Sequence, residues 1–112
     1  MQFFPTSIIR ASFEFNCLPS VCRLGLVTNF CGHGVGTVFH ASPAVMHHAN
    51  NEPDVMRVGQ TFTIEPMLTT GSVKGRFWAD KWTCVTPDGS LSAQYEHTLL
   101  ITESGVEILT LP

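Results

Sequence analysis

From Gly25 to the C-terminus, short apolar runs alternate with turn-forming residues, and this rhythm favours β-strands over helices. In the run TFTIEPML, Phe62 and Ile64 fall on one face of a strand, while Thr63 and Glu65 fall on the other. Successive side chains of a strand point to opposite faces, so this run predicts a half-buried strand with an apolar and a polar side.

A second run, AQYEHTLLIT, alternates in the same way, with Glu96 and His97 on opposite faces. The turn residues Ser104-Gly105 then separate two apolar runs, which predicts a hairpin. With the remaining turn signals, we expect about five or six short strands and no strong amphipathic helix. The predicted fold class is α+β, a mainly antiparallel sheet with a short N-terminal helix.

The chain reads as two parts, residues 1–24 and residues 25–112. Residues 1–24 have apolar side chains without a helical or strand period, and they predict a poorly ordered segment. Their arginines, serines and aromatics also leave open a weak likeness to an organelle transit peptide. Residues 25–112 predict one domain, because a chain with 44% hydrophobic and only 13% charged residues can form a core.

Charge and cysteine content narrow the classes of partner and compartment. The net charge is -3 and the six basic residues are scattered, so neither nucleic acid nor an anionic membrane is an expected partner. No apolar run approaches the roughly 20 residues that span a bilayer. The four cysteines lack a repeated spacing and no signal sequence precedes them, which predicts reduced thiols and an intracellular location.

Two histidines stand near glycines at the start of the second part. His33 lies in CGHGVG, where glycines on both sides let the backbone approach closely and present the imidazole. His40 follows seven residues later, so strand parity alone puts it on the opposite face. A bulge or bend at Gly34 or Gly36 is required if the two histidines share a site.

Two glutamates, Glu65 and Glu96, each lie inside an apolar strand run. A carboxylate removed from water is costly unless it is paired or binds a metal. With His33, these glutamates form a ligand set suited to Mn, Co, Fe or Zn. The alternative is that both lie on solvated sheet faces. Phe39 and Trp82 also have two interpretations: they are core aromatics, or they form the wall of an apolar pocket.

Four segments in one order resemble the type I methionine aminopeptidases, members of the pita-bread metallopeptidases. They are CGHGVGTVFHASP, TFTIEPML, DKWTCVTPDGS and LSAQYEHTLLIT. The resemblance runs from about Gly25 to Pro112 and implies the C-terminal half of a pita-bread fold. The segment HHAN is closest to organellar members, so cytoplasm, mitochondrion and plastid stay open with a slight preference for an organelle.

The resemblance implies a role for each residue singled out above. His33, Glu65 and Glu96 are expected to bind a dinuclear centre of Co, Mn, Fe or Zn, with Glu96 bridging both ions. Glu65 is also expected to act as the base toward the attacking water, and His40 to hydrogen-bond the scissile amide. Phe39 and Trp82 are expected to line the methionine pocket, together with His40.

The family takes two further aspartate ligands from a preceding half that this sequence does not show. We therefore expect a partial catalytic domain, acting on N-terminal Met peptides of nascent proteins only when complete. Alone it is expected to be weak or inactive and to expose apolar surface, with the missing N-terminal half as one possible partner. The alternative is a non-catalytic remnant that binds a peptide, a partner chain or a single metal.

Overall fold

The computed structural model describes residues 24–51 and 53–112, and every regular element within them is a strand. The strands are β1 (Gly25–Leu26), β2 (Gly32–Gly34), β3 (Ala41–Val45), β4 (Thr61–Ile64), β5 (Met67–Thr69), β6 (Arg76–Phe77), β7 (Cys84–Val85), β8 (Ser92–Gln94), β9 (His97–Thr102) and β10 (Gly105–Ile108). The described part of the chain contains no helix long and apolar enough to cross a membrane. The predicted poorly ordered segment and short N-terminal helix concern a region that, apart from Leu24, lies outside the described residues.

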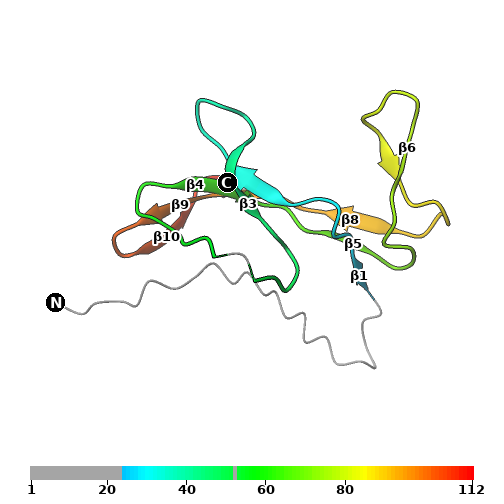
Figure 1. Ribbon diagram of the computed structural model, residues 1–112, viewed down its shortest axis with the longest axis horizontal. Coiled ribbons are helices and arrows are strands. Elements are labelled where there is room, and N and C mark those ends of the chain that lie inside the picture. The colour runs from blue at the N-terminus through cyan, green and yellow to red at the C-terminus, as the bar shows by residue number, and fades with distance from the viewer. Residues whose placement is uncertain (1–23, 52) are drawn as a thin grey trace.

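The strands form two main sheets and a small hairpin, all antiparallel, which confirms the predicted mainly antiparallel architecture. One sheet has the order β10-β9-β4-β2-β3, and the other has the order β1-β5-β8. Figure 1 shows the two sheets lying end to end, with the β6–β7 hairpin projecting from the region of the smaller sheet. The chain passes between the two sheets three times, from β1 to β2, from β4 to β5 and from β8 to β9.

The predicted C-terminal hairpin is confirmed, since β9 pairs with β10. Leu99 faces Ile108 at one end of the pairing, and Thr102 faces Gly105 at the other. The predicted polar face of β4 is wrong in one respect. Phe62 and Thr63 are both only 2% exposed, although they point to opposite faces of the strand. Thr63 is covered because β4 lies inside the larger sheet and its hydroxyl is held between two neighbouring groups of the site described below.

The buried core of the described residues is small. Its apolar members are Val27, Val45 and Phe62, and its polar members are His47, Thr63 and Thr69. Large apolar side chains remain exposed, the most open being Phe39, Tyr95, Leu91 and Trp82. This agrees with the expected exposure of apolar surface.

Candidate metal centre

Glu65 and Glu96 lie where the chain passes from one sheet to the other. β4 and β9 pair in the larger sheet, and β5 and β8 pair in the smaller one. Glu65 follows β4 directly and Glu96 precedes β9 directly. The sequence predicted both glutamates inside strands, and in this respect the prediction is wrong. Pro66 has no N–H group to donate to a ladder, which accounts for an interruption at this point.

The pairing register continues unchanged across the interruption. The last pair of the larger sheet and the first pair of the smaller one fit a single register: Ile64–His97 and Met67–Gln94. Glu65 therefore lies opposite Glu96. Like charges directly opposite each other destabilise an antiparallel pair. A cation between the two carboxylates removes this repulsion.

His33 approaches the same point from β2, the strand next to β4. Its glycine neighbours are sterically required, because a Cβ at Gly32 would collide with the Thr63 carbonyl and one at Gly34 with the Ser42 carbonyl. The register of β2 against β3 shifts between His33 and Gly34, which is the predicted bulge. Close backbone packing on both sides thus fixes where the imidazole points.

The hydrogen bonds of His33 leave one ring nitrogen available as an acceptor. Nδ1 lies 3.0 Å from the carbonyl oxygen of Gly34, and a carbonyl only accepts, so Nδ1 carries the proton. Nε2 lies 3.3 Å from Oε1 of Glu65, which is an ion pair when the ring is protonated, and in the neutral ring its lone pair is available to bind a cation. A histidine held in this way through its other nitrogen has the arrangement of a metal ligand.

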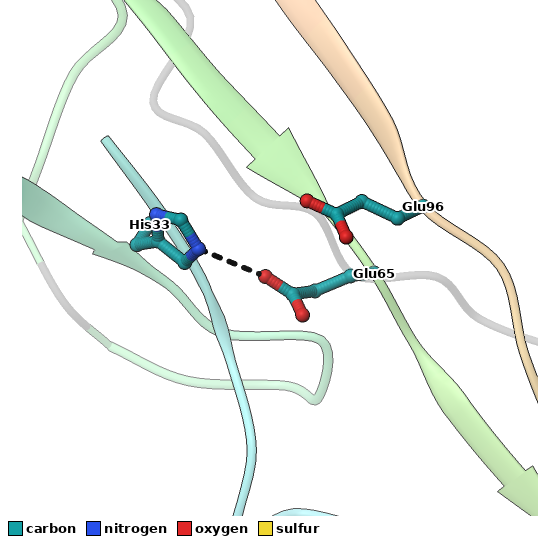
Figure 2. A group of neighbouring side chains, drawn as sticks. All are labelled: His33, Glu65 and Glu96. Atoms are coloured by element: carbon teal, nitrogen blue, oxygen red, sulfur yellow. Dashed lines mark ion pairs between the residues drawn. The ribbon is translucent and has the colours of Figure 1, made fainter. Parts of the chain in front are cut away.

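Together His33, Glu65 and Glu96 offer ligand atoms that all lie within 4.8 Å of one another. Figure 2 shows the three side chains directed toward a common point. His33 and Glu65 are 16% and 15% exposed, whereas Glu96 lies on the exposed side of the cluster. An imidazole nitrogen and two carboxylates, all acceptors, fit a borderline divalent cation and leave positions open for water.

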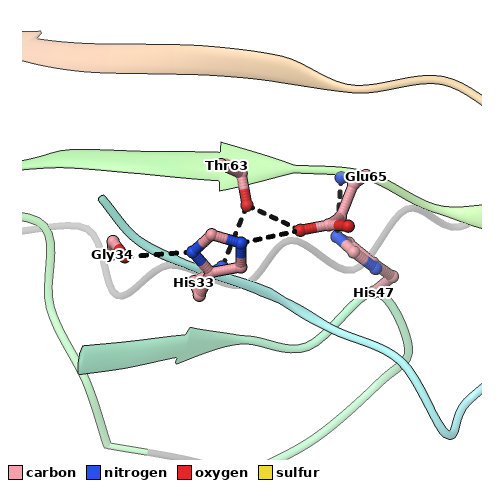
Figure 3. Close-up of polar contacts among 5 residues, drawn as sticks. All are labelled: His33, Gly34, His47, Thr63 and Glu65. Carbon is pink, nitrogen blue, oxygen red and sulfur yellow. Dashed lines mark hydrogen bonds and ion pairs between the residues drawn. The ribbon is translucent and has the colours of Figure 1, made fainter. Parts of the chain in front are cut away.

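Thr63 supports this cluster, although the sequence pattern does not predict a role for it. Its hydroxyl donates to Oε1 of Glu65 at 2.8 Å and accepts from the backbone N–H of His33 at 3.0 Å (Figure 3). One side chain thus holds two of the three candidate ligands. Its sequence signal was misleading, because alternation with Phe62 predicted a solvated threonine.

His47 is the second residue near the cluster whose role the sequence pattern does not predict. It is 2% exposed, and its Nε2 accepts a hydrogen bond from the backbone N–H of Glu65 at 3.0 Å (Figure 3). Burial lowers the pKa of His47 below 6.5, more than the nearby charge of Glu65 raises it. The neutral ring is the form that can accept this hydrogen bond.

His40 and Phe39 lie beside His33, as the bulge allows. The rings of His33 and His40 meet edge to face with centroids 4.4 Å apart, and Phe39 contacts both rings. Phe39 is 71% exposed, so its ring is open to solvent beside His33. The structure therefore brings together His33, Phe39 and His40, which the sequence places on a single short segment.

Trp82 does not join these ring contacts. It lies between β6 and β7 and is 82% exposed, so it is not a core aromatic. Its backbone N–H donates to Oδ1 of Asp80, whose carboxylate also accepts from Thr83. These hydrogen bonds lower the pKa of Asp80, the side-chain bond from Thr83 contributing most. Asp80 thus fixes the turn that presents the indole.

Comparison with known sequences gives one family match and several close relatives. The sequence model of metallopeptidase family M24 matches residues 8–103. Methionine aminopeptidase 1D, chloroplastic/mitochondrial, from Arabidopsis thaliana is 61% identical over 88 residues, which are 79% of this chain and 25% of that protein. Methionine aminopeptidase 1 from Saccharomyces cerevisiae is 56% identical over 89 residues, 79% of this chain and 23% of that protein.

Solved structures agree with the sequence comparison. A methionine aminopeptidase from Rickettsia prowazekii superposes with a TM-score of 0.74 and 40% identity, covering 80% of this chain and 37% of that one. The enzyme from Thermotoga maritima gives a TM-score of 0.75 and 41% identity, covering 80% and 36%. These likenesses confirm the predicted pita-bread architecture. The chain spans about a quarter of the length of the curated relatives that it matches.

Proposed function

Because the chain belongs to metallopeptidase family M24, we propose that it forms part of a metal-dependent aminopeptidase that removes N-terminal methionine from nascent proteins. The observation that carries this proposal is the convergence of His33, Glu65 and Glu96 at the interrupted register. Relatives named as methionine aminopeptidases support the substrate class.

The residues of the cluster divide the chemistry among them. A divalent ion bound by the cluster lowers the pKa of water and polarises a carbonyl group. The Glu65 carboxylate, oriented by the Thr63 hydroxyl, accepts the proton of the attacking water. His40 hydrogen-bonds the scissile amide and stabilises the negative charge that develops on its oxygen. The contact between the His40 and His33 rings supports this role.

Phe39, His40 and Trp82 are proposed to contact the substrate. Phe39 packs against His40 and offers an exposed apolar ring next to the cluster. The methionine side chain is apolar and polarizable, and contact between its sulfur and an aromatic ring is favourable. Trp82 would form a second wall, presented by the turn that Asp80 holds.

The number and identity of the ions belong to this proposal as well. The three protein donors of the cluster would hold one ion. A second ion would require further ligands. The family resemblance attributes these to two aspartates of a preceding half, which would then be the partner of this segment. We expect Co, Mn, Fe or Zn as the ions, and little or no turnover by the 112-residue chain alone.

The proposed location is intracellular, with preference for an organelle. The Arabidopsis relatives include proteins named as chloroplastic/mitochondrial and as chloroplastic, which supports this preference. Imaging of the tagged chain together with plastid and mitochondrial markers tests it.

Calorimetric titration of the purified chain with Mn(II) tests the metal site. Wild type should bind one Mn(II), and Glu96→Gln should not. Glu107→Gln is a matched control, since Glu107 is an exposed glutamate on β10 that is not in the cluster. Absence of binding by wild type would leave the non-catalytic peptide- or partner-binding module as the better account.

A further inference from the structure

We propose that His47 is a positioning residue, which fixes Glu65 in its ligand position by accepting a hydrogen bond from the Glu65 backbone N–H. This inference rests on the proposed function, because it assigns a role toward the same metal cluster. It adds a residue from outside the ligand and substrate groups, on the segment that follows β3.

The Glu65 N–H group needs an acceptor at this place. β4 ends one residue earlier, so the β4–β9 ladder supplies no acceptor for the Glu65 N–H group. A buried backbone N–H without a partner costs about 1–3 kcal/mol, and nearly all such groups are paired in native structures. Nε2 of His47, at 3.0 Å, is the acceptor that the structure supplies.

The burial of His47 indicates that the hydrogen bond is its purpose. His47 is 2% exposed. An apolar side chain of similar volume would fill the same space without a polar atom that needs a hydrogen-bond partner. The contact also joins chain segments that are not neighbours, because β2 lies between β3 and β4 in the sheet. His47 therefore ties the end of β3 to the end of β4 across the strand that carries His33.

The position of the Glu65 backbone decides where its carboxylate lies relative to Glu96 and His33. Thr63 fixes the carboxylate from the side-chain end, and His47 fixes the residue from the backbone end. Groups that orient metal ligands in this indirect way typically change metal affinity about 10–100-fold when they are removed. We expect an effect of that size at His47.

The hydrogen bond can be observed in the metal-free, uniformly ¹⁵N-labelled wild-type chain. An N–H···N hydrogen bond transmits a ¹⁵N–¹⁵N scalar coupling between the Glu65 amide and Nε2 of His47. The expected result is this coupling, with Nδ1 carrying the ring proton. A protonated Nε2, or no coupling with both resonances resolved, would overturn the inference. This readout is independent of metal, so it distinguishes failure here from failure of the proposed function.

Variants then test the positioning role. His47→Leu removes the acceptor at comparable volume, and His47→Gln keeps an acceptor oxygen near the place of Nε2. We expect Mn(II) affinity to fall about 10–100-fold in His47→Leu and to recover most of the way in His47→Gln. His48→Gln, a change at the adjacent histidine outside the cluster, should bind like wild type. Equal affinity of folded His47→Leu and wild type would refute the role. If His47→Leu does not fold, the Gln variant and the wild-type coupling decide.

Discussion

Glu65 and Glu96 are opposite each other in one continuous register, at the point where two antiparallel ladders are interrupted. The break and the pairing act together. The break frees both residues from strand hydrogen bonding, and the register keeps their carboxylates on the same side. Two acidic groups are thereby held at short range, at a cost that a bound cation offsets.

Neutralising Glu96 should have opposite effects with and without metal. In EDTA, Glu96→Gln removes the facing charges and should stabilise the chain by about 0.2–1 kcal/mol. With Mn(II) at 100 times the dissociation constant, wild type should gain about 2.7 kcal/mol, and the variant should gain little. Urea unfolding with and without Mn(II) measures both. The same ranking of the two proteins in both buffers would argue against a shared site.

Gly34→Ala should destabilise the chain and disturb the bulge beside His33. The added Cβ would collide with the Ser42 backbone, and overpacking of this kind costs about 1–3 kcal/mol. Gly36→Ala is the control, because a Cβ there has nothing within 4 Å. Urea denaturation midpoints of the two variants measure the difference. Equal midpoints would show that the close approach at Gly34 is not a constraint.

Thr63→Val should damage the cluster while keeping its volume. The change deprives the His33 N–H and the Glu65 carboxylate of a partner, at a cost of about 1–3 kcal/mol. Thr63→Ser keeps the hydroxyl and should retain most of the Mn(II) affinity that Thr63→Val loses. Calorimetry of the two variants provides the comparison. Matching affinities would mean that the hydroxyl does not orient Glu65.

The stability of the turn that presents Trp82 should fall at acid pH, because Asp80 becomes protonated there. The folded-state pKa of Asp80 lies below the reference value of 3.8, so its ionised form stabilises the turn above pH 3.8. That contribution is lost as the pH falls through the lower folded-state pKa. An NMR titration of the Asp80 carboxyl carbon and the Trp82 amide should show one common midpoint below 3.8. Thr83→Val removes the hydrogen bond that contributes most to the lowered pKa of Asp80, so it should move this midpoint upward. A wild-type midpoint at or above 3.8 would contradict the stabilising role of ionised Asp80.

Much of the fold was predictable because its signals are local. Turn residues at Ser104-Gly105 and alternation in the flanking runs predicted the β9–β10 hairpin. The glycines around His33 predicted a close backbone approach and a bulge, and both are present. The resemblance of four segments supplied the ligand triad, which the structure brings together.

The features that were not predicted depend on long-range contacts, which the alternation of apolar and polar residues does not encode. The runs around Glu65 and Glu96 keep their period through the interruption, so they read as unbroken strands. Thr63 appeared solvated because its partners come from β2 and from two residues further along. His47 reaches Glu65 past an intervening strand, and the order of strands in a sheet is not written in either segment.

Anomalous diffraction from crystals of the 112-residue chain grown with Mn(II) tests the central claim most directly. The account predicts a manganese peak bonded to Nε2 of His33 and to carboxylate oxygens of Glu65 and Glu96. Manganese bound elsewhere, or no peak among these three side chains at saturating metal, would contradict it.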